Sequence, residues 1–324
     1  MQYRYTAYGL VIDTDRQLSG VREISRASEA ADLFIHFETR LPTTLHWQAH
    51  SRFKSTHHAD QGDQPALRIL ESSDGEWTRL AYIEGMQFTV DHAGRVIWVE
   101  YEPAVPFDYV QHYLLNTMVG LALRLREVVC LHASAIEMDG RAYLIAGDSG
   151  AGKSTTSLYC LLQGQGFLSD NLSVLTVDSG GLSVQAGIPR LRLTPTSSHA
   201  LFGTILPPLV NRRSKTYIEL EEYGVRTVGR ALPLGGVYIL TTRANRLAIS
   251  PLEPKLAFIT LMNHVYLRYL LDYRARSVDT VLLARLAQMI PVTVVTPQDD
   301  LNALPALYAA LVADATRARP PLSA

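Results

Sequence analysis

Hydrophobic and polar positions alternate along much of the first third of the chain, which is the period of strands with one buried face. The clearest case is FTVDHAGRVIWVEY, where alternating apolar residues flank an Asp-His-Ala-Gly turn. This pattern predicts a β-hairpin. From Phe107 the period changes. Apolar positions in FDYVQHYLLNTMVGLALRLREV recur every three or four residues and predict an amphipathic helix.

Beyond this helix, both periods occur in turn. A strand, a turn at Met138-Asp139-Gly140 and a second strand, RAYLIAG, come first, and a helix is predicted from Lys153 to about Gln163. FLSDNLSVLTV is predicted as the next strand. Further strands, GGVYILTT and PVTVVT, are interspersed with helices in PKLAFITLMNHVYLRYLL, SVDTVLLARLAQMI and ALPALYAALVADA. We therefore expect a β-rich N-terminal domain over 1–105, a bridging helix over 106–127, an α/β domain over 128–315 and a flexible tail over 316–324.

Composition narrows the class of protein. The chain has 324 residues, of which 47% are hydrophobic and 19% charged, enough for two domains with sizeable cores. A formal net charge of -1 gives no sign of a protein that coats nucleic acid or a membrane surface. Two cysteines fit a reducing cytoplasm, and we find neither a signal-peptide pattern nor an apolar run of membrane-spanning length. We expect a cytoplasmic protein without nucleic-acid or membrane partners.

One short segment, GDSGAGKS, matches the whole phosphate-binding pattern G-x-x-x-x-G-K-[ST]. Its glycines allow positive φ, so that backbone N–H groups can surround phosphate oxygens at the start of a helix. Lys153 would reach the β- and γ-phosphates, and the Ser154 hydroxyl would ligate Mg²⁺. The predicted nucleotide-binding residues are Gly147, Asp148, Ser149, Gly150, Ala151, Gly152, Lys153, Ser154 and Thr155.

Phosphoryl transfer also needs groups that position or activate the acceptor. Asp170 lies 17 residues after Lys153, at the start of the next predicted strand, and a three-turn helix with a short return would bring it beside the loop. His132 lies 21 residues before Lys153, at the start of the preceding hairpin. Their positions are also compatible with purely structural roles, because Asp170 could cap a turn and His132 could be a packed histidine.

Three segments, LHASAIEMDGRAYLIAGDSGAGKST, GQGFLSDN and AGIPRLRL, together resemble the HPr kinase/phosphorylase family and its catalytic-domain relatives. Those relatives include kinases encoded beside lasso-peptide genes. The similarity covers residues 131–195 and continues more weakly to about 300, whereas the first 105 residues do not resemble the N-terminal domain of the bifunctional enzyme. It implies an α/β P-loop kinase domain of the HPr-kinase type, with a mixed sheet and flanking helices.

The resemblance also implies roles for single residues. Lys153 and Ser154 match the nucleotide and metal positions. Asp170 matches the aspartate that acts as general base toward the acceptor hydroxyl, and His132 matches a histidine near the phosphates. Asn171 stands where the family usually has a second aspartate. Its amide oxygen can still contact Mg²⁺, with one negative charge fewer, so we include it in the predicted metal site.

These implications point to a Mg²⁺- and ATP-dependent kinase that transfers the γ-phosphate to a hydroxyl. The expected acceptor is a serine of a peptide or small protein, such as HPr or a lasso-peptide precursor. The family segment that supports dephosphorylation has no clear counterpart, so we expect no phosphorylase activity. Two alternatives stay open: a kinase for a small molecule such as free serine, and a non-catalytic nucleotide-binding switch. The sequence does not name the acceptor or the purine, and a homo-oligomer rests only on analogy.

Several polar residues outside these motifs could serve the same site. Arg190 and Arg192 alternate on PRLRL, so both would share one face of a strand, directed toward the site or toward solvent. Lys215, in the run RRSK, could contact phosphate or an acidic acceptor, or lie on a solvated loop. His57 and His58 lie on a polar loop with no third ligand at fixed spacing, so we expect solvated surface residues instead of a metal site. Interface or surface positions are expected for His264 and Arg268.

Overall fold

The structure is a computed structural model, and it describes residues 2–25, 30–37, 45–49, 66–178, 181–204, 216–270 and 273–317. The chain divides into two compact units, residues 1–128 with 267–276, and residues 129–266 with 277–324. Among the described helices, none is long and apolar enough to cross a membrane. His57, His58 and Lys215 lie outside the described residues, so their predicted roles stay predictions.

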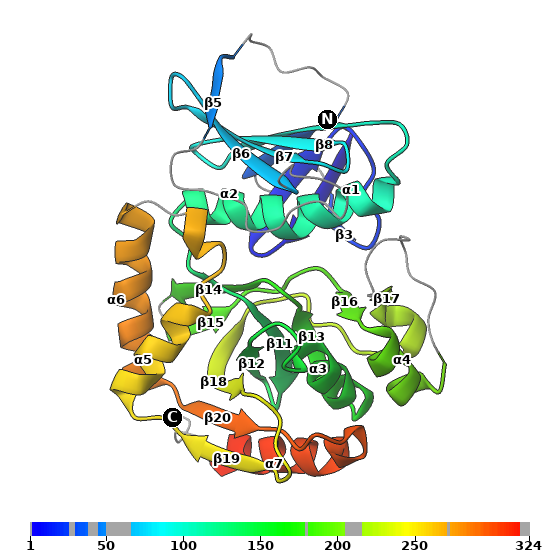
Figure 1. Cartoon of the computed structure of the whole chain (residues 1–324), viewed down its shortest axis with the longest axis vertical. Coiled ribbons are helices and arrows are strands. Elements are labelled where there is room, and N and C mark those ends of the chain that lie inside the picture. Colours follow the sequence, from blue (N-terminus) through cyan, green and yellow to red (C-terminus); the bar gives the residue numbers. More distant parts are fainter. Residues whose placement is uncertain are drawn as a thin grey trace. The chain divides into compact units, whose positions relative to one another are not determined.

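The first unit contains a sheet with nine described strands in the order β3-β1-β2-β4-β9-β8-β7-β6-β5 (Figure 1). Neighbouring strands are antiparallel except for the β2–β4 and β4–β9 pairs. The predicted hairpin is confirmed, with Met86 opposite Tyr101. The strands are β1 Tyr3–Ala7, β2 Leu10–Thr14, β3 Arg22–Glu23, β4 Leu33–His36, β5 Trp47–Ala49, β6 Leu67–Ser72, β7 Trp77–Tyr82, β8 Met86–Asp91 and β9 Val96–Tyr101.

The helix predicted from Phe107 is confirmed, and it belongs to the first unit. It consists of α1 (Phe107–Tyr113), a π-helical turn η1 (Leu114–Met118) and α2 (Val119–Leu125). Most of its apolar side chains are buried, as the helical period requires. The hairpin turn approaches it closely at Gly94, where φ is +64° and a Cβ atom would lie 2.3 Å from the Ala122 carbonyl oxygen. Only glycine fits this contact.

The second unit is mixed α/β. Its described strands follow the order β10-β14-β15-β18-β12-β11-β13, and β20 pairs with both β18 and β19. The β12–β18 and β18–β20 pairs are parallel, whereas the other pairs in this sheet are antiparallel. The strands are β10 Cys130–Leu131, β11 Ala133–Met138, β12 Arg141–Gly147, β13 Gly166–Ser169, β14 Ser173–Asp178, β15 Gly181–Val184, β18 Leu232–Leu240, β19 Ala248–Pro251 and β20 Val292–Thr296, with β16 Arg190–Leu193 and β17 Thr216–Glu219 forming a separate pair.

Helices α3 (Lys153–Leu162) and α7 (Leu304–Arg317) share one hydrophobic core with the β11 and β12 side of this sheet (Figure 1). Tyr238 lies in this core, and its hydroxyl donates a 3.0 Å hydrogen bond to the Leu311 carbonyl oxygen in α7. The core therefore fixes both the helix that follows the glycine-rich segment and the helix that ends the unit. The remaining helices are α4 Pro195–Phe202, α5 Pro254–Asn263 and α6 Tyr273–Met289, with short 3₁₀ turns η2 Leu220–Tyr223, η3 Arg268–Leu270 and η4 Leu301–Ala303. Of these, η3 and the start of α6, up to residue 276, belong to the first unit.

Two predictions about elements were wrong. FLSDNLSVLTV forms two strands, β13 and β14, rather than one, because the chain turns at Asp170-Asn171-Leu172. Asn171 takes a left-handed φ of +69°, which asparagine tolerates better than most residues. Asp170 therefore follows the end of a strand instead of beginning one.

The second wrong prediction concerns PKLAFITLMNHVYLRYLL, which does not form a single helix. Helix α5 ends at Asn263, and Val265 pairs with Leu131. The backbone N–H of His132 also donates to the His264 carbonyl oxygen at 2.7 Å. Backbone pairing with the strand that precedes β11 replaces the helical bonds that the sequence period favours. The C-terminal helix α7 also extends further than predicted. It includes residues 316 and 317, which were predicted as part of a flexible tail.

Candidate active site

The glycine-rich loop, residues 147–152, joins the end of β12 to the start of α3. Three glycines in it take positive φ: Gly147 at +146°, Gly150 at +88° and Gly152 at +102°. A Cβ atom on Gly147 would lie 2.5 Å from the Leu240 carbonyl oxygen in the adjacent strand β18. The loop thus needs glycine both for its backbone conformation and for its close packing against the sheet. Such a loop at a helix start suits an anion.

Lys153 is the first residue of α3, and its ammonium group lies against the same loop. Nζ donates to the carbonyl oxygens of Gly147 at 2.8 Å and Asp148 at 3.1 Å. The lysine is thereby held at the loop instead of extending into solvent. It supplies a positive charge where the loop's N–H groups would face a phosphate.

A cavity of about 340 Å³ opens beside this loop. It gathers residues that the sequence places far apart, from the loop, the turn after β13, strand β16, helix α4 and the loop after β18. Most residues predicted for the site line it, and four others join them. The lining consists of His132, Ser149, Gly150, Gly152, Lys153, Ser154, Thr155, Asp170 and Asn171, together with Arg192, Thr194, Ser197 and Arg243. Gly147, Asp148 and Ala151, also predicted, belong to the loop but are not among these lining residues.

Asp170 is buried in the wall of the cavity and is only 8% exposed. Its carboxylate accepts hydrogen bonds from the Ser134 hydroxyl and from the Ser154 hydroxyl, the latter at 3.2 and 3.3 Å to the two oxygens. The backbone N–H of Arg192 adds a third donor at 3.2 Å. Three protein donors thus converge on the carboxylate and fix its orientation against the first turn of α3.

The Ser154–Asp170 pair has the donor set that Mg²⁺ prefers. Both side chains present oxygen, one of them in a carboxylate. Because the Ser154 hydroxyl donates its proton to Asp170, its oxygen lone pairs remain for a metal. Asn171 lines the same cavity and offers an amide oxygen. These residues fit a Mg²⁺ ion whose other ligands would be phosphate oxygens and water.

His132 lies between β10 and β11 and lines the cavity. Its ring packs edge-on against Tyr266, with centroids 6.2 Å apart. The neighbouring His264 was predicted as a surface or interface group, but it is 9% exposed, so the surface prediction was wrong. Burial lowers the pKa of His264, Asp148 acts in the opposite direction and Lys153 reinforces the lowering. Arg268 is exposed, as predicted.

Three arginines have positions that the sequence left open or did not suggest. Arg192 lines the cavity, whereas Arg190, on the same face of β16, forms a 2.7 Å ion pair with Glu219. Arg243 also lines the cavity, and its Nη2 donates to the Gly150 carbonyl oxygen at 3.4 Å. The sequence held no local signal for Arg243; it reaches the site because it follows β18, which runs parallel to the strand that leads into the loop. Residues beyond the carboxyl ends of parallel strands meet at one edge.

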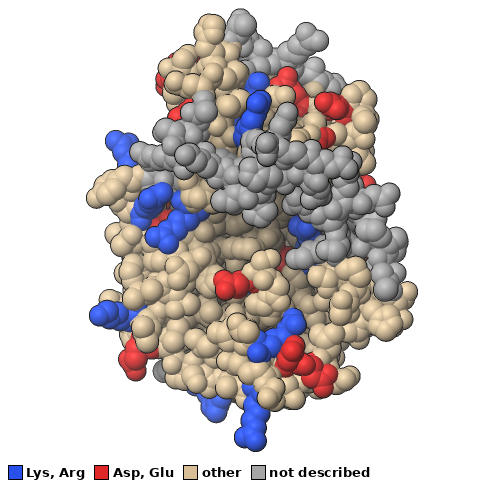
Figure 2. All heavy atoms as spheres, in the orientation of Figure 1, with Lys and Arg blue, Asp and Glu red and all other residues tan. Residues whose placement is uncertain are grey.

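Positive charge at the site is local. On the face shown in Figure 2, basic and acidic side chains of the described residues are interspersed and do not gather by sign. The chain's formal net charge of -1 agrees with this distribution. Attraction for an anion therefore depends on Lys153, Arg192 and Arg243, which act at short range.

The chain was compared with protein families, curated proteins and solved structures. No family model and no curated protein matches the chain. Among solved structures, the Hpr(Ser) kinase/phosphatase from Coxiella burnetii is similar over 58% of this chain and 95% of that chain, with 12% sequence identity and a TM-score of 0.33. Similarity at this level is distant, and we draw no functional conclusion from it.

Proposed function

We propose that the second unit binds ATP with Mg²⁺ and transfers the γ-phosphate to a hydroxyl group. One observation carries the proposal: the glycine-rich loop, Lys153 and the Ser154–Asp170 pair lie in one cavity. Each supplies a different requirement of phosphoryl transfer, namely a phosphate cradle, a positive charge and oxygen ligands for a metal. Little covalent chemistry by the protein is needed, because positioning and charge stabilisation account for most of the catalysis.

In this proposal the loop's N–H groups and Lys153 hold the phosphate chain. Ser154 and Asp170 hold Mg²⁺, and Asn171 contributes its amide oxygen. When bound, Mg²⁺ neutralises charge on the β- and γ-phosphates. Arg192 stabilises the equatorial oxygens of the transferred group, because its strand directs it into the same cavity.

Asp170 has two candidate roles. The family resemblance assigns it as the base for the acceptor hydroxyl. Its contacts favour a metal role, because three protein donors already converge on the carboxylate and one of them is the Ser154 hydroxyl. We therefore propose that Asp170 holds and orients the Mg²⁺ shell, and that His132, which lines the cavity, acts on the acceptor proton.

For the acceptor we propose a serine of a peptide or small protein. The support is the family resemblance together with an open cavity whose walls beyond the loop carry His132, Asn171 and Arg192. A small-molecule hydroxyl such as free serine is the alternative within enzymes. A non-catalytic switch is the alternative outside them, and Asn171 in place of a second carboxylate is the observation that favours it.

The test combines binding with transfer. ATP·Mg²⁺ binding is measured by calorimetry for the wild type and for Lys153→Ala, and transfer is followed by mass spectrometry with serine-containing peptides and with free serine. We expect ATP affinity to fall at least about tenfold in Lys153→Ala, with loss of transfer and an unchanged melting temperature. Unchanged affinity in the variant would exclude the phosphate cradle. ATP binding without transfer or hydrolysis would identify the protein as a switch.

A further inference from the structure

A second cavity, of about 210 Å³, adjoins the phosphate cavity. Three residues line both: Gly152, Thr155 and Arg243. The second cavity also contacts the loop and α3 at Ala151 and Thr156, and it extends to residues 297–307, which follow β20. A single extended molecule could therefore occupy both cavities, passing over the start of α3.

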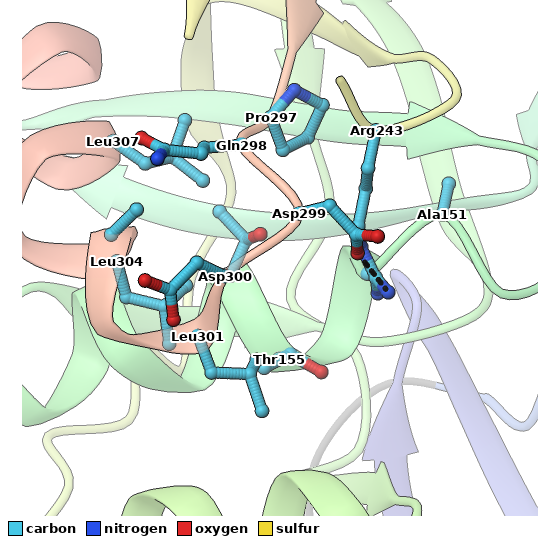
Figure 3. Close-up of a pocket in the computed structure, with 13 residues that line it drawn as sticks. Ala151, Thr155, Arg243, Pro297, Gln298, Asp299, Asp300, Leu301, Leu304 and Leu307 are labelled. Atoms are coloured by element: carbon cyan, nitrogen blue, oxygen red, sulfur yellow. Dashed lines mark ion pairs between the residues drawn. The ribbon is translucent and has the colours of Figure 1, made fainter. Parts of the chain in front are cut away.

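The chemistry of the second cavity differs from that of the first. Its inner wall is apolar, and Pro297, Leu304 and Leu307 are buried there. Its rim is polar, with the exposed side chains of Asp299 and Asp300 (Figure 3). An apolar wall with polar acceptors at the edge suits a flat heterocycle that carries N–H or O–H donors at its periphery.

The two cavities also differ in the charged side chains near them. Arg243 donates to the Gly150 carbonyl oxygen at 3.4 Å and forms a 3.7 Å ion pair with Asp299 (Figure 3). The arginine thus stands between the glycine-rich loop and the acidic rim. Beyond it, Asp299 and Asp300 repel phosphate groups, whereas they accept hydrogen bonds from neutral donors. A nucleotide would place its phosphates on the loop side of Arg243 and its uncharged part on the other.

We propose that the second cavity is the nucleoside subsite: it holds the base against Pro297, Leu304 and Leu307, and its acidic rim accepts hydrogen bonds from the ribose hydroxyls or the base amino group. This inference rests on the proposed nucleotide binding and specifies the orientation of the bound nucleotide. The nucleoside lies toward residues 297–307, so the opposite side of the phosphate cavity, with His132, Asn171 and Arg192, is left for the acceptor.

The test separates the nucleoside from the phosphates. Calorimetry in Mg²⁺ compares ATP with inorganic tripolyphosphate for the wild type, for Ala303→Trp, which places an indole in the second cavity, and for Ala306→Trp. Ala306 is exposed on the first turn of α7 and does not line the cavity, so it is the matched control. Melting temperatures check that each variant is folded.

We expect the wild type to bind ATP about tenfold or more tightly than tripolyphosphate. In Ala303→Trp the ATP affinity falls by at least about tenfold while the tripolyphosphate affinity is unchanged, and Ala306→Trp behaves as the wild type. Equal wild-type affinities for the two ligands would overturn the subsite, and this comparison does not depend on any variant folding. A folded Ala303→Trp variant with normal ATP affinity would also overturn the subsite. If the wild type binds neither ligand, the proposed function itself fails.

Discussion

The Ser154 hydroxyl donates to the Asp170 carboxylate at 3.2 Å, across a separation of sixteen positions in the chain. Helix α3 carries the chain away from the glycine-rich loop, and β13 returns it antiparallel to β11, so the turn after β13 lies at the loop. This contact joins the residue predicted to ligate metal to the residue predicted to act as a base. Asp170 could therefore act either as part of the metal site or as the general base.

Substituting Asp170 by asparagine distinguishes the two roles. If Asp170 orients the metal shell, Asp170→Asn raises the Mg²⁺ concentration for half-maximal transfer by roughly 10–100-fold, and saturating Mg²⁺ restores much of the rate. If it is the base, the single-turnover rate falls about 10²–10⁴-fold at every Mg²⁺ concentration. We expect the first result. Ser134→Ala is the control, because Ser134 donates to the same carboxylate without belonging to the loop.

The residue after Asp170 offers a second test of the metal site. Asn171→Asp adds a carboxylate at a left-handed position that aspartate also tolerates, so the turn should persist. An added charge near Mg²⁺ contributes at least about 1 kcal/mol, which lowers the half-saturating Mg²⁺ concentration about fivefold or more. Titration of activity with Mg²⁺ measures this. Gln288→Glu, exposed on α6, adds the same charge away from the cavity and should have no effect. An unchanged Mg²⁺ dependence in Asn171→Asp would place residue 171 outside the metal shell.

Gly147 is predicted to be irreplaceable for two separable reasons. Gly147→Ala brings a Cβ atom to 2.5 Å from the Leu240 carbonyl oxygen at φ +146°. Gly164→Ala, at φ +94° with no atom within 4 Å, tests backbone strain alone. We expect Gly164→Ala to cost about 1–2 kcal/mol of unfolding free energy and Gly147→Ala clearly more, with loss of ATP binding. Urea unfolding measures both, and equal losses would show that the close approach to β18 contributes nothing.

Glu137 gives the second unit an acid-sensitive contact. Burial opposes its ionisation, but hydrogen bonds from Arg226 and from the Gly140 N–H outweigh burial and lower its pKa. Because the pKa of Glu137 is lower in the folded protein than in the unfolded chain, its ionised carboxylate stabilises the fold. This stabilisation is complete above the unfolded pKa, near 4.5, and is lost as the pH falls through the folded pKa.

The variant Glu137→Gln should therefore be less stable than the wild type at pH 7, by about 1 kcal/mol given the half-exposed arginine. The difference should shrink as pH falls below about 4.5, which chemical denaturation at several pH values can follow. Glu253→Gln, on an exposed residue, is the control. A difference that stays constant with pH would mean that the Glu137–Arg226 contact does not depend on the carboxylate charge.

Much of the local structure followed from the sequence alone. The β8–β9 hairpin, the helix from Phe107 and the strand–loop–helix segment around Lys153 are each encoded within a few residues of one another. Period, turn residues and glycine spacing act over such short distances, so they can be recognised without knowing the fold. The turn at Asp170-Asn171 carried the same kind of signal, an Asp-Asn pair, but the apolar residues on both sides favoured one continuous strand.

What surrounds the glycine-rich loop was decided by tertiary structure. Arg192 and Arg243 reach the cavity because β16 and the end of β18 lie beside the loop, and no local pattern distinguishes them from solvated arginines. The same holds for the second cavity, whose wall comes from residues 297–307. His264 follows a helical pattern in the sequence, yet its carbonyl pairs with His132. Hydrogen bonds and burial between distant segments depend on which strands become neighbours, and only the folded sheet determines that.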